Sequence, residues 1–256
     1  VFAMVICFWI GTRQSVWFDE AYSISVAQQT AGQVINLTAA DTHPPLYYLA
    51  LKAWGSTFGW GEAALRNMSI LAYGCSIVAA AALARKMFGT RAAVISAIFL
   101  LFAPLLMRYG FEIRMYSLAS LICVVATYVL VKARATTKQK PAKLLWVLYA
   151  ILVATGMYTL YYTALLWVAH LVWLVATERS SARKFWRRPY VLSYLGAVAL
   201  FLPWLPLFAK QLTNGALAAI TQPMNLEQLI GVVSFNFLYK PLWQLDVLDS
   251  IAMLAV

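Results

Sequence analysis

Long apolar runs alternate with short polar stretches along most of this chain. Runs of roughly 17–25 residues without central charges are long enough for a helix to cross the hydrocarbon core of a bilayer. We expect such helices at residues 67–88, 91–108, 114–133, 144–158, 159–177 and 191–209, with the end of one more span in 1–12 and the start of another from 242. Because no run shows the alternation of a half-buried strand, the pattern predicts an all-α polytopic membrane protein.

The composition supports this fold class and explains the charge. With 63% hydrophobic and 11% charged side chains among 256 residues, the chain is too apolar for one soluble domain. The net charge of +11 suggests a nucleic-acid partner, but the basic residues gather in loops 84–91, 132–143 and 178–190, where Glu178 is the only acid. Loops rich in lysine and arginine stay in the cytoplasm. Membrane topology therefore accounts for the charge, and we expect no nucleic-acid partner.

Alternation from these loops places four other segments on the outer face of the membrane. They are residues 13–66, 108–114, 156–161 and 210–241. Residues 46–54 (LYYLALKAW) are apolar but too short to cross a bilayer, which favours a helix lying at the interface. A second interfacial helix is expected from Asn225, because Gln228 follows it at the spacing of a capping pair.

The chain has no Gly/Ser linker and no low-complexity tract. We therefore expect a single transmembrane domain over residues 1–256, with outer loop 13–66 and outer segment 210–241 as its main extramembrane parts. Both ends of the chain lie inside apolar runs, so we expect the sequence to be truncated at both ends.

Two adjacent carboxylates, Asp19 and Glu20, follow Trp17 and Phe18 close to the expected outer membrane surface. A charge at this depth is costly to bury unless it meets a cation, a metal or a reacting group. The alternative is structural: Asp19 can cap a helix that starts near Ala21, with Glu20 favourable to the helix dipole. The pair is a candidate for either chemistry or helix capping.

The stretch DTHPPLYY, residues 41–48, places Asp41 two residues before His43, and Pro44 and Pro45 then fix the backbone. A histidine here can bind a phosphate, donate a proton or ligate a metal. Asp41 and His43 are candidate ligands for a divalent metal cation, although two ligands make an incomplete site. The alternative is a hydrogen-bonded histidine in an ordinary turn.

The turn RYGFEIRMYS, residues 108–117, carries Arg108, Glu112, Arg114 and Tyr116. Arg108 and Glu112 are four residues apart, the spacing of an ion pair on a helix. Two arginines beside one glutamate leave a positive surplus at headgroup depth, and the arginine fork binds phosphate oxygens in bidentate fashion. A lipid-linked phosphate therefore suits Arg108 and Arg114, while the alternative is interfacial snorkelling with an internal ion pair.

The expected topology brings these three clusters to one face, where they suit a sugar carried on a lipid phosphate. In this order, FDEAYSISVA, DTHPPLYYLAL and FEIRMYSL resemble the polyprenyl-phosphate-sugar-dependent membrane glycosyltransferases of the GT-C fold, the group that contains protein O-mannosyltransferases and the aminoarabinose transferases of lipid A. The resemblance extends from residue 13 to about 120, and more loosely over LPWLP and the outer segment after it. It implies a GT-C-type transmembrane helix bundle with short interfacial helices on the outer face.

The resemblance also implies a reaction: transfer of a sugar from a polyprenyl-phosphate donor to an acceptor hydroxyl, with inversion of the anomeric centre. Asp19 would be the catalytic base, and Glu20 would position the acceptor or the acidic pair. The residues expected to bind the donor phosphate are His43, Arg108 and Arg114, and those expected to support them are Asp41, Glu112 and Tyr116. The acceptor is open between a protein, a lipid and a glycan. The expected location is a prokaryotic cytoplasmic membrane, with the site facing the periplasm or exterior.

Two other classes of protein stay open at this point. A transporter or flippase for a lipid or small solute would place ionisable residues or broken helices near mid-membrane. Here the centres of the expected spans contain almost no ionisable residue, and the acids gather in outer loops. A structural or assembly protein would explain the hydrophobicity but not three polar clusters on one face. The pattern favours interfacial chemistry over both.

Overall fold

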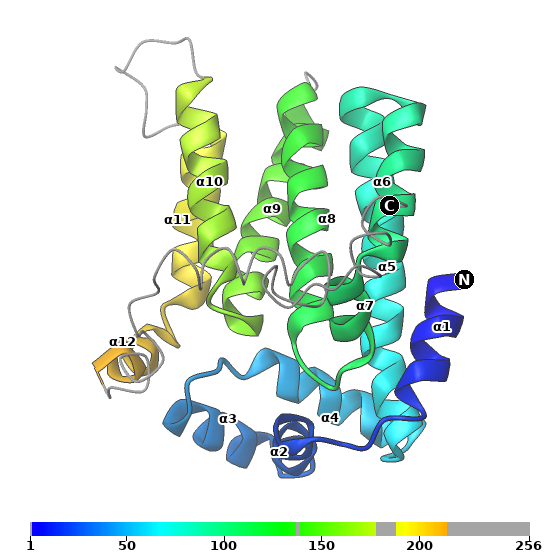
Figure 1. Ribbon diagram of the computed structural model, residues 1–256. Helices are drawn as coiled ribbons and strands as arrows, with labels where there is room; N and C mark the ends of the chain where they lie inside the picture. The colour runs from blue at the N-terminus through cyan, green and yellow to red at the C-terminus, as the bar shows by residue number, and fades with distance from the viewer. Residues whose placement is uncertain (1, 137–138, 178–187, 214–256) are drawn as a thin grey trace, which may run out of the picture.

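The computed structural model describes residues 2–136, 139–177 and 188–213, and within them every regular element is an α-helix (Figure 1). The helices are α1 (Phe2–Gly11), α2 (Phe18–Ala27), α3 (Ala31–Ala40), α4 (Leu46–Phe58), α5 (Glu62–Phe88), α6 (Thr90–Phe102), α7 (Pro104–Phe111), α8 (Tyr116–Ala135), α9 (Gln139–Thr159), α10 (Thr163–Ala176), α11 (Pro189–Phe201) and α12 (Leu205–Thr213). The predicted all-α fold class is confirmed over these residues. The helix expected from Asn225 and the span expected from residue 242 lie outside them.

Three helices in the described ranges are long and apolar enough to cross a membrane, namely α5, α8 and the Lys140–Thr159 part of α9. Two bent pairs, α6 with α7 and α11 with α12, raise this number to five if each pair is one span. α1 and α10 are shorter apolar helices. These helices make the chain an integral membrane protein.

The runs predicted as spans at 91–108 and 191–209 each contain a sharp bend that the hydropathy pattern does not show. α6 and α7 meet at 66°, and α11 and α12 meet at 77°. Proline disfavours helical backbone in the residue before it and cannot donate to the carbonyl four residues back. Ala103 is accordingly extended (ψ 112°) and Pro104 begins α7. The carbonyl of Leu100 accepts instead from the hydroxyl of Tyr73 at 2.7 Å.

α2, α3 and α4 form a layer across one end of the bundle, at the bottom of Figure 1. Residues 46–54, predicted as a helix at the membrane interface, are helical and form most of α4, while their place at the interface stays a prediction. Buried apolar side chains join this layer to α5 and to the turn between α7 and α8: Val26, Ala27, Val34, Tyr47, Tyr48, Leu51, Leu65, Ile113 and Met115. Because Ile113 and Met115 are fully buried, the turn that carries Arg114 is anchored on both sides.

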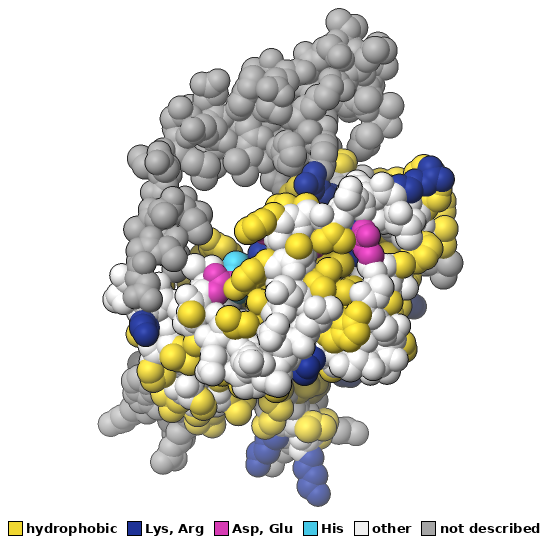
Figure 2. Space-filling model, turned by 90° about the horizontal axis from the view of Figure 1, so that it is seen from below, with side chains coloured by type: hydrophobic (Ala, Val, Ile, Leu, Met, Phe, Trp, Pro, Cys, Tyr) yellow, Lys and Arg dark blue, Asp and Glu magenta, His cyan; other side chains and the backbone are white. Residues whose placement is uncertain are grey.

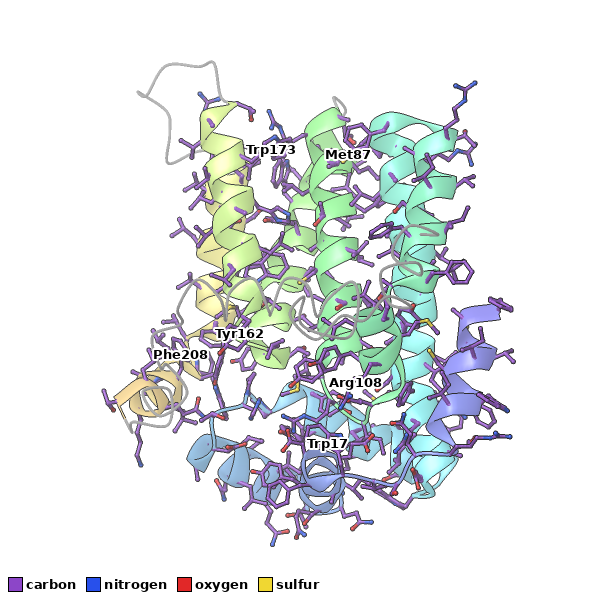
Figure 3. All side chains as sticks on the ribbon, viewed as in Figure 1. Trp17, Met87, Arg108, Tyr162, Trp173 and Phe208 are labelled. Carbon is purple, nitrogen blue, oxygen red and sulfur yellow. The ribbon has the colours of Figure 1, made fainter. Side chains whose placement is uncertain are left out.

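Basic residues lie at the opposite end of the bundle. α5 ends with Arg85 and Lys86, and α8 ends with Lys132 and Arg134. Gly89, whose φ of 91° favours glycine, lets α6 follow α5 at once and return along it. Figure 3 labels Met87 and Trp173 toward this end, and Trp17 and Arg108 toward the end that carries α2–α4. The structure thus keeps these basic helix ends apart from the acidic clusters.

Candidate active site

Asp19 lies in the first turn of α2, with its side chain 37% exposed. α2 begins at Phe18 with Trp17 at the N-cap position, so the alternative in which Asp19 caps a helix starting near Ala21 is wrong. One carboxylate oxygen of Asp19 lies 3.6 Å from Nη2 of Arg114. Nη1 of Arg114 donates to the backbone carbonyl of Asp19 at 3.4 Å. The carboxylate therefore faces a cation while staying accessible to solvent.

Asp41 and His43 lie in the short connection between α3 and α4. Nδ1 of His43 is 3.2 Å from Oδ2 of Asp41, and the hydroxyl of Thr42 donates to the other carboxylate oxygen at 3.4 Å. Burial alone would raise the pKa of Asp41, but hydrogen bonds from His43, Thr42 and Tyr22 bring this pKa below its usual 3.8. For Tyr22, burial and the nearby Asp41 charge raise the pKa to about 12. Asp41 is held as a carboxylate that orients His43.

Arg114 is the point at which the three predicted clusters meet. Besides Asp19, its guanidinium donates to the hydroxyl of Ser23 at 3.4 Å and faces Nε2 of His43 at 3.5 Å. It also lies over the ring of Tyr116, 5.9 Å from the ring centre. Because arginine can only donate, Nε2 of His43 accepts, and this assigns the imidazole proton to Nδ1. The structure therefore brings together side chains that the sequence separates by up to 95 residues.

Arg108 and Glu112 form the ion pair expected from their spacing, with Nε of Arg108 3.2 Å from Oε1 of Glu112. The arginine side chain is 46% exposed, whereas that of Glu112 is buried. Burial raises the pKa of Glu112, and the Glu20 charge raises it further, against the lowering effect of Arg108. The roles assigned to Arg108 at the phosphate and to Glu112 as its support stay predictions.

Glu20 points into the protein rather than toward Arg114. Its carboxylate is buried and lies 3.1 Å from Nη2 of Arg66. The backbone N–H of Ile113 donates to Oε1 at 2.9 Å, and that of Trp17 donates to Oε2 at 3.3 Å. Arg66 is buried too, pairs with Glu62 at 2.8 Å, and donates to backbone carbonyls at and after the end of α1. These contacts turn Glu20 inward, and the role predicted for it, to position the acceptor or the acidic pair, stays a prediction.

The Asp41–His43 pair does not fit a metal site. No group of three or more His, Cys, Asp or Glu side chains that could hold a metal ion occurs among residues 2–136, 139–177 and 188–213. Oδ2 of Asp41 is engaged with Nδ1 of His43, and the other imidazole nitrogen faces the Arg114 guanidinium. A cation at that nitrogen would meet a like charge. The predicted divalent cation stays a prediction, and no step below depends on it.

Sequence reasoning missed the central structural role of Arg66. Its four-residue spacing from Glu62 predicts no more than a local ion pair on a helix, yet the structure joins it to Glu20, 46 residues away in sequence. The available signal was an arginine at the edge of a long apolar run, because such charges are costly without a partner. Ser23 and Tyr22 were also missed. They occupy the α2 face next to Asp19 and carry no motif of their own.

Taken together, apolar helices of membrane-spanning length and a carboxylate, an imidazole and a guanidinium that converge at one end of them define a membrane protein with a candidate polar site. The face that carries this site is shown in Figure 2, where acidic and histidine side chains lie among apolar ones. The sequence model of the family described as dolichyl-phosphate-mannose-protein mannosyltransferase matches residues 42–206, and the chain belongs to this family. It is thus a GT-C glycosyltransferase that depends on a polyprenyl-phosphate sugar.

The matched range includes His43, Arg108 and Arg114, whereas Asp19 and Glu20 precede it. A search of curated proteins and a search of solved structures each found no match. The family resemblance inferred from the sequence is confirmed, and it favours glycosyl transfer over the transporter alternative. The individual roles of the site residues stay predictions.

Proposed function

We propose that the protein transfers a sugar from a polyprenyl-phosphate donor to an acceptor hydroxyl at the membrane face that carries α2–α4, with inversion of the anomeric centre. The observation that carries this proposal is the convergence on Arg114. The accessible carboxylate of Asp19 lies 3.6 Å from Nη2 of Arg114, and Nε2 of His43 lies 3.5 Å from the same nitrogen. A base and a phosphate-binding cation are thereby held side by side.

In the proposed step, the acceptor oxygen attacks the anomeric carbon as its proton passes to the Asp19 carboxylate. The bond between that carbon and the phosphate oxygen breaks, and the polyprenyl phosphate leaves with the electron pair. Arg114 stabilises the charge that develops on this phosphate. A single displacement of this kind inverts the anomeric centre. Positioned base catalysis supplies about 10²–10⁴-fold, so charge stabilisation must supply much of the rest.

A cavity that reaches Tyr116, the aromatic neighbour of Arg114, supports a lipid-linked donor. It has a volume of about 330 Å³ and lies between α5, the bend of α6 and α7, and α8. Tyr116, whose ring contacts the Arg114 guanidinium, lines it together with apolar side chains that include Ile77 and Val124. An isoprenoid chain can therefore run from the phosphate position into an apolar space.

The orientation is part of the same proposal. The basic ends of α5 and α8 suit the cytoplasmic side by the positive-inside rule. The site at the other end then faces the exterior, or the periplasm of a prokaryotic cell. The acceptor is an alcohol on a protein, lipid or glycan that reaches this face. Mass spectrometry of surface glycans from cells with and without the gene identifies it.

Asp19→Asn tests the chemical role of the base. The amide keeps the size of the side chain but cannot accept the proton, so we expect turnover to fall by about 10²-fold or more. Donor binding should persist, because Arg114 and His43 are unchanged. The assay uses the full-length protein in nanodiscs with a polyprenyl-phosphate sugar, and NMR of the product gives the anomeric configuration.

Glu62→Gln is the matched control, because this carboxylate is partly exposed and pairs with Arg66 instead of Arg114. It should retain turnover. Full activity of Asp19→Asn would exclude the base assignment, and a retained anomeric configuration would exclude the single displacement.

A further inference from the structure

A chain of hydrogen bonds joins α12 to the end of α3. Nε1 of Trp204 donates to the hydroxyl of Tyr161 at 2.6 Å, and this hydroxyl donates to Oε1 of Gln211 at 2.6 Å. Nε2 of Gln211 then donates to the backbone carbonyl of Thr38 at 2.7 Å. Gln211 is 3% exposed. Segments that are far apart in the sequence thus meet at one buried amide.

The donor and acceptor roles in this series of hydrogen bonds are fixed by its first donor and its last acceptor. An indole N–H can only donate and a backbone carbonyl can only accept, so the amide oxygen of Gln211 must face Tyr161 and its NH₂ group must face Thr38. The Thr38 carbonyl belongs to the last turn of α3, where carbonyls lack full intrahelical partners. Gln211 therefore supplies the shorter of two hydrogen bonds to this carbonyl, the other being that of the Asp41 backbone N–H.

The position of α3 depends on few contacts. Of its ten residues only Val34 and Thr38 are buried, so little apolar packing holds the helix against the rest of the molecule. Asp41 is the C-cap residue of α3, and its backbone N–H bonds to the same Thr38 carbonyl at 3.3 Å. The acceptor atom fixed by Gln211 is thereby one hydrogen bond away from the Asp41–His43 pair.

We propose that Gln211 is a positioning residue for the donor site. By holding the end of α3, it sets where Asp41 places the His43 imidazole against Arg114. The residue itself touches neither Asp19 nor Arg114 in any hydrogen bond of the described residues. This inference rests on the proposed function, because it assigns a role to His43 in binding the donor phosphate.

Gln211→Leu in the full-length protein tests the inference. Leucine has a side chain of similar size to glutamine but makes neither hydrogen bond. We therefore expect the KM for the polyprenyl-phosphate sugar to rise on the order of tenfold. The KM for the acceptor should stay the same, because Asp19 is held by other contacts. Lys210→Ala, at an exposed position on the same helix, is the control and should leave both constants unchanged.

A double-mutant cycle with His43→Ala separates positioning from a general loss of structure. If Gln211 acts through His43, Gln211→Leu should give no further rise in donor KM when His43 is already absent. An equal rise in both backgrounds, or no rise in either, overturns the inference. If Gln211→Leu does not fold, Tyr161→Phe takes its place in the cycle, since it removes the bond to the amide oxygen, together with the bond from Trp204 Nε1, and leaves Gln211 itself in place.

The cycle also distinguishes this inference from the function on which it rests. Full turnover by Asp19→Asn would refute the proposed function, whatever the result of the double-mutant cycle. An inactive Asp19→Asn together with additive effects at Gln211 and His43 would defeat the positioning role alone.

Discussion

Replacing Glu20 by glutamine separates a structural from a chemical role for this carboxylate. In the structure Oε1 accepts from the Ile113 backbone N–H, and Oε2 faces Arg66 at 3.1 Å. Glu20→Gln keeps an oxygen acceptor for Ile113 but removes the charge that neutralises Arg66. We therefore expect a loss of stability, with the turnover of the folded protein largely retained.

The magnitude follows from the burial of both partners. Removing one member of a buried ion pair costs about 3–5 kcal/mol, and a hydrogen bond to a charged group contributes about 1.5–3 kcal/mol. Glutamine keeps the acceptor for the Ile113 N–H but loses the weaker bond from the Trp17 N–H at 3.3 Å. Since Arg66 keeps Glu62 and backbone carbonyls, about 2–3 kcal/mol is the expected cost. For a domain of this size that lowers the apparent melting temperature by roughly 5–10 °C.

Glu62→Gln is again the matched control, because it removes a carboxylate from the same arginine. The Glu62 side chain is 39% exposed, so water and salt screen the pair and its loss should cost about 0.5 kcal/mol or less. The measurements are thermal unfolding by tryptophan fluorescence in detergent and sugar transfer at a temperature where both variants are folded. A Glu20→Gln protein with unchanged melting temperature and abolished transfer would refute the structural reading.

Two further predictions concern the donor site. Arg114→Lys keeps the charge but loses the fork that reaches two phosphate oxygens, so the Kd for the polyprenyl-phosphate sugar should rise on the order of tenfold or more in a binding assay; an unchanged Kd would contradict the phosphate role. Hydrogen bonds hold the pKa of Asp41 below 3.8 against the effect of burial, so its carboxylate stabilises the fold fully above about pH 4 and that contribution disappears as the pH falls through the lowered pKa. Asp41→Asn should therefore flatten the acid side of a plot of melting temperature against pH, and an unaltered plot would contradict the assignment.

Hydropathy alone predicted where the apolar helices lie but not how two of them bend. The apolar run at 91–108 is continuous in composition, yet Pro104 ends α6 and begins α7. A hydropathy sum does not depend on backbone geometry, so it cannot indicate a bend. A proline can, because it disfavours helical backbone in the residue before it. The bend between α11 and α12 lies near Pro203 but has another form. Leu202 stays in the helical region (φ −49°, ψ −42°), and the N–H groups of Trp204 and Leu205 donate to the carbonyls three residues back, at 3.0 and 3.2 Å.

The short helices of loop 13–66 show what local signals can and cannot predict. α3 begins at a readable capping pair, in which Gln33 Oε1 accepts from the Thr30 backbone N–H at 3.0 Å and Thr30 Oγ1 accepts from Gln33 N at 3.4 Å. The start of α3 is therefore predictable from the sequence. The contact between Gln211 and the Thr38 carbonyl had no such signal, because it joins residues 173 positions apart.

The two neighbouring carboxylates of α2 illustrate how a fold gives one motif two functions. Adjacent residues on an α-helix point about 100° apart, so a helix lying on the end of the bundle cannot turn both acids the same way. Asp19 remains partly exposed beside Arg114, while Glu20 is directed inward to Arg66 and the Ile113 N–H. Because Ile113 immediately precedes Arg114, the buried carboxylate fixes the distance between α2 and the turn that carries the guanidinium. In the proposed reaction, Glu20 thereby sets the geometry in which Asp19 would act as the base.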